Sequence, residues 1–187
     1  MPTIGSTNLT KSEKKKNIEK LTKQILNTIG IELTDGIMET PKRIANMLID
    51  ELLIGLDKSN FPEYKMFEID KKAQCEPVIV ENISIFSICE HHFLPFIGKA
   101  TFKYLPKNKI IGLSKIPRII DFLSRKPQVQ ERLTIEIFNE FKKILKTEDI
   151  SVSLTCEHFC TKIRGIKDNC VMTTSKSGGF FKKNNQQ

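Results

Sequence analysis

Long apolar runs are missing from this sequence. No stretch approaches the ~20 consecutive apolar residues that a membrane-spanning helix requires. The first residues, Met1 to Ser6, lack the charged-then-apolar pattern of a secretory signal. The five cysteines are therefore expected as reduced thiols and not as a disulfide framework. We expect a cytoplasmic protein with no membrane partner.

Histidine is scarce, and its distribution is uneven. The chain has three histidines, and all of them lie in two short motifs, Cys89-Glu90-His91-His92 and Cys156-Glu157-His158-Phe159-Cys160. Three of the five cysteines lie in the same motifs. Thiolates together with imidazoles are the donors that zinc prefers. The two motifs therefore predict a metal site built from distant segments.

The spacing leaves the choice of ligands open. Alternation along a strand would place His158 and Cys160 on one face, together with Val152, Leu154 and Cys156. Cys89 would face His91 in an extended chain, but would meet His92 in a turn or helix.

Two kinds of zinc site are compatible with these motifs, and core thiols without a metal are a third interpretation. Three protein ligands and an open position are typical of catalytic zinc. A closed structural site would instead add Cys156 or His158 as a fourth ligand to Cys89, His92 and Cys160. The motifs alone do not separate these alternatives.

Acidic residues are absent from one long segment. None occurs between His91 and Ile120, whereas that segment has six basic residues: Lys99, Lys103, Lys107, Lys109, Lys115 and Arg118. From His158 onward the segment to Lys183 has a single acid, Asp168. The net charge is +8. Such a distribution attracts a polyanion, either a nucleotide polyphosphate or a nucleic acid.

Periodicity predicts helices and strands in a definite order. Helices are expected over 14–29, from Thr40-Pro41 to Gly55, over 114–123 and over 128–145, and strands over 77–88, 97–104, 109–111, 150–160 and 169–175. We expect an α+β fold with an N-terminal helical region (1–60) and a second domain (61–187). The second domain should be a four-stranded antiparallel sheet with two helices between the strand pairs. Its two open edges favour oligomerisation.

Two helix starts could contact a nucleotide. Ser114, followed by Lys115 and Arg118, combines a helix N-terminus with cations, which suits phosphate, although ordinary capping explains Ser114 as well. Glu131 lies in the first turn of the next helix. A carboxylate can accept both N–H donors of a guanine edge, although the helix dipole alone also favours an acid there.

Several motifs occur together in a recognisable order. They are Thr40-Pro41-Lys42-Arg43, Cys89-Glu90-His91-His92 with Leu94-Pro95-Phe96, Gly112-Leu113-Ser114-Lys115, Gln128-Val129-Gln130-Glu131-Arg132-Leu133, and His158-Phe159-Cys160 with Arg164-Gly165. In this order, over residues 13–181, the sequence resembles GTP cyclohydrolase I. The resemblance implies the tunnelling-type fold, with sheets joined into a barrel of five subunits and two such rings stacked into a decamer. Active sites in that family lie between subunits.

The resemblance also implies a reaction and roles for residues. GTP and water would give 7,8-dihydroneopterin triphosphate and formate, the first step of pterin and tetrahydrofolate biosynthesis. Cys89, His92 and Cys160 would bind Zn²⁺, which activates water, and His91 and His158 would move protons. The substrate-binding residues would be Gln130 and Glu131 at the guanine edge, Ser114, Lys115, Arg118 and Arg164 at ribose and triphosphate, and Arg43 from a neighbouring subunit.

Two other interpretations compete with this hypothesis, and one residue departs from the usual pattern of the family. A structural-zinc protein that binds nucleic acid is disfavoured because neither motif has paired ligands at finger-like spacing, so no nucleic-acid partner is expected. A relative with the same fold could act on another purine or pterin.

Cys156 replaces the small residue usual in the family, so it could compete as a ligand or simply pack as a buried thiol.

Overall fold

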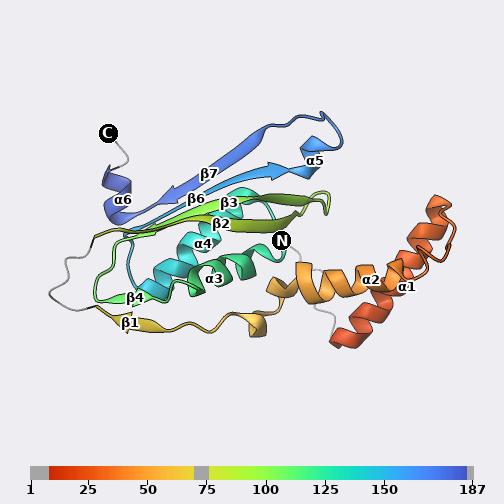
Figure 1. The fold of residues 1–187 in the computed structure, drawn as a ribbon, viewed down its shortest axis with the longest axis horizontal. Helices are drawn as coiled ribbons and strands as arrows, with labels where there is room; N and C mark the ends of the chain where they lie inside the picture. The colour runs from red at the N-terminus through yellow and green to blue at the C-terminus, as the bar shows by residue number, and fades with distance from the viewer. Residues whose placement is uncertain (1–8, 70–75, 185–187) are drawn as a thin grey trace. The chain divides into compact units, whose positions relative to one another are not determined.

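The computed structural model describes residues 9–69 and 76–184 (Figure 1). The chain divides into two compact units, Met1–Ile54 and Gly55–Gln187. The expected division at residue 60 lies close to this one, and its assignment to two domains stays a prediction. Cys75 lies outside the described residues.

The first unit is helical. Helix α1 (Lys11–Ile29) begins three residues earlier than predicted, because Thr10 and Glu13 form a reciprocal capping box at its start. Helix α2 (Thr40–Asn46) begins with Pro41 in its first turn and continues as a π-helical segment, η1 (Met47–Leu52). Two short 3-10 turns follow in the chain, η2 (Ile54–Leu56) at the boundary of the units and η3 (Lys58–Asn60) within the second unit.

The second unit is a mixed α+β structure, as predicted. Its strands are β1 (Met66–Glu68), β2 (Val78–Cys89), β3 (Pro95–Tyr104), β4 (Lys109–Ile111), β5 (Pro127–Gln128), β6 (Ile150–His158) and β7 (Val171–Ser177). Its helices are α3 (Lys115–Ser124), α4 (Gln130–Leu145), α5 (Phe159–Lys162) and α6 (Gly179–Asn184).

The main sheet has the strand order β5-β2-β3-β6-β7. Strands β2, β3, β6 and β7 pair with one another in that order, each antiparallel to the next, and α3 and α4 lie between β3 and β6 in the chain. Two features were not predicted: β5 pairs in parallel with the end of β2, and β1 pairs with β4 in a separate small sheet. Pairing of Cys89 with Gln128 brings the first metal motif to the start of α4.

The core lies between the sheet and the helices α3 and α4, which cover one face of it (Figure 1). Alternate residues of β6, from Ile150 to Cys156, are buried, as period-two alternation requires. The ring of Phe102 on β3 lies 4.2 Å from that of Phe141 on α4. Within the described residues, no helix has the length and apolar character needed to cross a bilayer.

Candidate metal centre

A tight turn at the end of β2 determines the partner of Cys89. The Cys89 amide donates to the Leu94 carbonyl at 2.8 Å, and the Phe93 amide donates to the Cys89 carbonyl at 2.9 Å. Phe93 has a left-handed φ of 54°, which reverses the chain. The turn brings His92 toward Cys89, so of the two alternatives left open by the spacing, the turn is the one observed.

The second motif is part strand and part helix. Strand β6 ends at His158, and the single-turn helix α5 carries Cys160. The Thr161 hydroxyl donates to the His158 carbonyl at 2.9 Å, which stabilises this change of direction. The prediction of a strand through Cys160 was therefore wrong at its end. The alternation of buried and more exposed side chains ends near the point where β6 stops pairing with β3.

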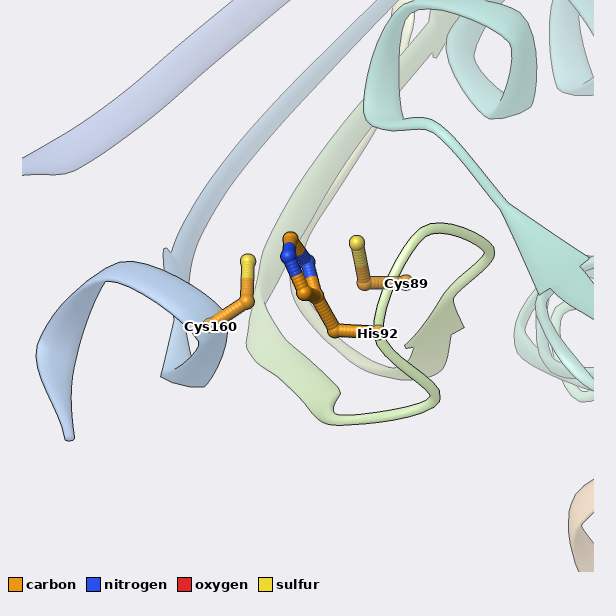
Figure 2. A group of neighbouring side chains, drawn as sticks. All are labelled: Cys89, His92 and Cys160. Atoms are coloured by element: carbon orange, nitrogen blue, oxygen red, sulfur yellow. The ribbon is translucent and has the colours of Figure 1, made fainter. Parts of the chain in front are cut away.

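Cys89, His92 and Cys160 nevertheless converge. Their ligand atoms all lie within 4.8 Å of one another, and the three side chains point toward a common space (Figure 2). Cys89 is buried, Cys160 is half-buried and His92 is exposed. No fourth histidine, cysteine or carboxylate from the described residues joins the group.

The donor chemistry of this group fits a soft divalent cation. Burial and the neighbouring Cys89 thiol both raise the pKa of Cys160. Two neighbouring thiols cannot both lose their protons without a large electrostatic penalty unless a cation lies between them. Two thiolates and an imidazole with one side open to solvent match a three-ligand metal site. The structure therefore contains a group able to hold a metal ion.

The two remaining histidines have different surroundings. His91 is exposed, with Nδ1 3.8 Å from Cys89 Sγ and Nε2 4.0 Å from Glu90 Oε1. His158 is half-buried and stacks on Phe96, with ring centroids 4.7 Å apart and planes inclined by 11°. Burial lowers the pKa of His158, although the carboxylate of Glu131 opposes this effect. Burial thus favours the neutral form of the His158 ring.

Gln130 and Glu131 differ in exposure. Glu131 is exposed, and its influence on the pKa of His158 shows that its carboxylate lies near that ring. Gln130 is 0% exposed, and its Oε1 lies 2.8 Å from His158 Nε2. Of this predicted pair, Glu131 has the side chain accessible to a ligand.

A polar network joins the ligand turn to the start of α4. The Arg132 guanidinium donates to Glu90, to Gln128 Oε1 at 2.8 Å and to the Pro127 carbonyl at 3.2 Å. The hydrogen bond from Arg132 is the main reason why the pKa of Glu90 is lowered. Sequence reasoning missed Glu90, Gln128 and Arg132 as well as the stacking of Phe96. All four lie inside the recognised motifs, but spacing could not show that they meet.

The predicted phosphate-binding residues are distributed over separate places. Ser114 is exposed at the N-terminus of α3, and its hydroxyl makes no capping hydrogen bond within the described part of the chain. It lines an open cleft of about 490 Å³ with Val80, Pro117 and Arg125, and that cleft includes no residue of the Cys-His-Cys group. Lys115 and Arg118 follow on α3, half-buried and exposed respectively.

Arg164 and Arg43 occupy other parts of the chain. Arg164 is exposed, and its charge lowers the pKa of Cys160, so it lies near the metal group. Arg43 is exposed on α2 in the first unit. The contribution of Arg43 to a site stays a prediction.

Cys156 is a packed thiol outside the group. It is 1% exposed, and burial raises its pKa to about 12. It pairs with Gly98 on β3, where an added Cβ would lie 2.7 Å from Cys156 Sγ and 2.0 Å from the Thr155 carbonyl oxygen. The thiol therefore fills space that the glycine leaves.

This chain is similar to named proteins over most of its length. The model of the family described as GTP cyclohydrolase I matches residues 18–187. A GTP cyclohydrolase 1 of Vibrio cholerae is 45% identical over 177 residues, 94% of this chain and 81% of that protein. The proteins of the same name from Photobacterium profundum and Shewanella denitrificans are 43% and 46% identical, each over 94% of this chain and 81% of theirs. A solved archaeosine synthase QueF-Like in the apo form is 14% identical, with a TM-score of 0.43 over 57% of this chain and 98% of that chain, too weak a likeness to support a conclusion. By its family match and its curated relatives, the chain belongs to the GTP cyclohydrolase I family.

Proposed function

We propose that this protein converts GTP and water to 7,8-dihydroneopterin triphosphate and formate. The observation that carries the proposal is the convergence of Cys89, His92 and Cys160 beside two histidines outside the group. The relatives named GTP cyclohydrolase 1 support the same activity. The reaction would be the first step of pterin and tetrahydrofolate biosynthesis.

Zinc is the metal proposed for the group. Cys89, His92 and Cys160 would hold it as two thiolates and one imidazole, leaving the fourth position toward solvent. When bound, zinc lowers the pKa of a water ligand to about 7 and so supplies a nucleophile at neutral pH. Magnesium and calcium are disfavoured because both prefer oxygen donors.

The two other histidines would move protons. Opening the imidazole ring of guanine breaks bonds between carbon 8 and nitrogen, and each departing nitrogen must gain a proton. His158 is half-buried and held at Nε2 by Gln130, so its position is defined before substrate arrives. His91 is exposed and less constrained, which suits transfer between solvent and the ribose.

Glu131 is the residue proposed to hold the guanine edge. Its carboxylate is exposed, lies near His158 and can accept two N–H donors at once. Gln130 was predicted to share this contact, but its buried side chain favours a supporting role.

The triphosphate would be bound by basic residues from more than one subunit. Arg164 lies near the metal group, whereas Ser114 lines a cleft apart from it, with Lys115 and Arg118 following on α3. We propose that a second copy of the chain brings the two sets together, and that Arg43 comes from a neighbouring subunit.

The assembly is proposed to be the tunnelling-type barrel of five subunits, stacked in pairs as a decamer. Strand β7 is the last strand of the sheet, and side chains on the face away from the helices remain exposed, among them Phe86 at 43% and Ile97 at 37%. Joining sheets edge to edge would pair such a strand and cover such side chains.

Turnover of GTP tests the proposed function. Purified protein with GTP should release formate and a pterin that fluoresces after oxidation, and a strong chelator should abolish both until zinc is restored. GMP and guanosine should be poor substrates because they lack the triphosphate. Absence of turnover by a zinc-loaded oligomer would overturn the proposal, and equal turnover of guanosine would indicate a different substrate.

A further inference from the structure

Gln130 is the first residue of α4, and its side chain is 0% exposed. Its amide nitrogen, Nε2, lies 3.1 Å from the Leu154 carbonyl oxygen and 3.0 Å from the Met172 carbonyl oxygen. Leu154 belongs to β6 and Met172 to β7. A buried polar group with so many partners is held in one orientation.

The two carbonyls determine which end of the amide faces them. A carbonyl oxygen only accepts hydrogen bonds, so the NH₂ group of Gln130, and not its oxygen, must face β6 and β7. Reversing the amide would bring its oxygen against two carbonyl oxygens, and no hydrogen would lie in either contact.

Two threonines strengthen the same orientation. The Thr134 hydroxyl donates to the Gln130 backbone carbonyl at 2.9 Å, so in its contact with Thr174, at 2.7 Å, Thr134 must accept. Thr174 has then used its only proton and can only accept from Gln130 Nε2, 3.1 Å away. Gln130 Nε2 has two hydrogens for the two carbonyl oxygens and the Thr174 hydroxyl, so these three acceptors share them.

The orientation of Gln130 fixes the proton on His158. Gln130 Oε1 is the remaining end of the amide, and it lies 2.8 Å from His158 Nε2. Since Oε1 can only accept, Nε2 must carry a hydrogen whether the ring is neutral or charged. Phe96, stacked on the ring at 4.7 Å, holds the plane of the imidazole.

We propose that Gln130 is a positioning residue that locks His158 with its proton on Nε2, so that Nδ1 is the nitrogen that faces the reaction. Nδ1 makes no hydrogen bond to the described residues. We propose this role for Gln130 in place of the predicted contact with guanine. The identity of the substrate rests on the proposed function.

Nuclear magnetic resonance can test the locked ring directly. The chain has three histidines, so protein labelled with [¹⁵N]histidine and carrying a tag without histidine gives three imidazole signals. Spectra of the zinc-loaded oligomer, with His158→Asn for assignment, should show Nε2 of His158 as the protonated nitrogen. This measurement needs no turnover, so it stands even if GTP is not the substrate. An unprotonated Nε2 would overturn the proposal.

Gln130→Ala separates positioning from substrate binding. We expect the single His158 tautomer to be lost and kcat to fall roughly 10- to 100-fold, with KM for GTP changed less than about twofold. Ser124→Ala is the matched control, because Ser124 is equally buried but its hydroxyl donates to the Ile120 carbonyl of α3, and it should leave the His158 signals unchanged. A raised KM with unchanged kcat would assign Gln130 to guanine instead, and an unchanged tautomer in Gln130→Ala would also overturn the proposal.

Discussion

At the scale of single residues, chemically identical side chains have different roles because their surroundings differ. Cys160 lies in the Cys-His-Cys group, whereas Cys156, four residues earlier, is a desolvated thiol against Gly98. Cys170 is exposed beyond both. Burial and neighbouring charges, rather than residue type, decide which thiol can ionise.

Thiol labelling should distinguish Cys156 from Cys170. Iodoacetamide at pH 8 reacts with thiolate, and a pKa of about 12 leaves Cys156 almost entirely protonated in the folded protein. Cys170 is exposed and should be modified promptly. Peptide mass spectrometry would measure both, with protein in urea as the control in which both react. Equal labelling of the two in folded protein would contradict the burial of Cys156.

At the scale of elements, the start of α4 supports the ligand turn. Arg132 on α4 donates to Glu90, which lies between Cys89 and His91 in the turn, and to Gln128 on β5. The Glu90 amide also donates to the Gln128 carbonyl at 3.0 Å. The helix, the short strand and the turn thus form one hydrogen-bonded unit.

Removing this support should weaken metal binding. Arg132→Met keeps much of the side chain's volume but leaves Glu90 and Gln128 without their donor, so we expect zinc affinity to fall roughly 10- to 100-fold. Competition with a zinc-binding dye would measure it. Glu148→Gln is the control, since it breaks the exposed pair with Lys142 near the other end of α4 and should leave zinc affinity unchanged. Unchanged zinc affinity in Arg132→Met would show that the turn holds its shape alone.

The sequence predicted those elements whose pattern is long and regular. Helix α4 and the buried face of β6 followed their periods over many residues. Helix α5 was not predicted, because the alternating pattern in the sequence continues to Cys160, although the pairing of β6 with β3 ends at His158. Strand β5 is two residues long and has no period to recognise.

The composition of the candidate site was easier to predict than its contacts. Scarce histidines identified both motifs, and the structure brings Cys89, His92 and Cys160 together. The burial of Gln130 could not be predicted, because its partners are backbone carbonyls of β6 and β7 far along the chain. Every residue type has a backbone carbonyl, so such acceptors cannot be recognised from the sequence.

In the proposed assembly, the site would combine residues from more than one chain. The metal group lies at the end of β2 and β6, whereas Lys115 begins α3, and the cleft at Ser114 contains none of the metal group. Symmetric assembly would supply the second set of residues from a neighbour.

Complementation tests this sharing. Cys160→Ala and Lys115→Ala should each be nearly inactive alone, because one lacks a metal ligand and the other a triphosphate contact. Co-expressed at equal levels, they should regain about a quarter of wild-type activity, since a random quarter of shared sites combine two intact halves. Oligomers formed from either variant alone serve as controls. No recovery in mixed oligomers of wild-type size would place both residues in the site of one chain.

Cys89, His92 and Cys160 are proposed to hold a catalytic zinc ion, and a comparison of two cysteine variants of the same motif tests this proposal. Bound zinc and GTP turnover would be measured together in Cys160→Ala and in Cys156→Ala. We expect Cys160→Ala to lose zinc and formate release together, whereas Cys156→Ala should keep both and lose about 1 kcal/mol of stability. Full zinc and turnover in Cys160→Ala, or loss of both in a folded Cys156→Ala, would show that the metal ligands are other residues.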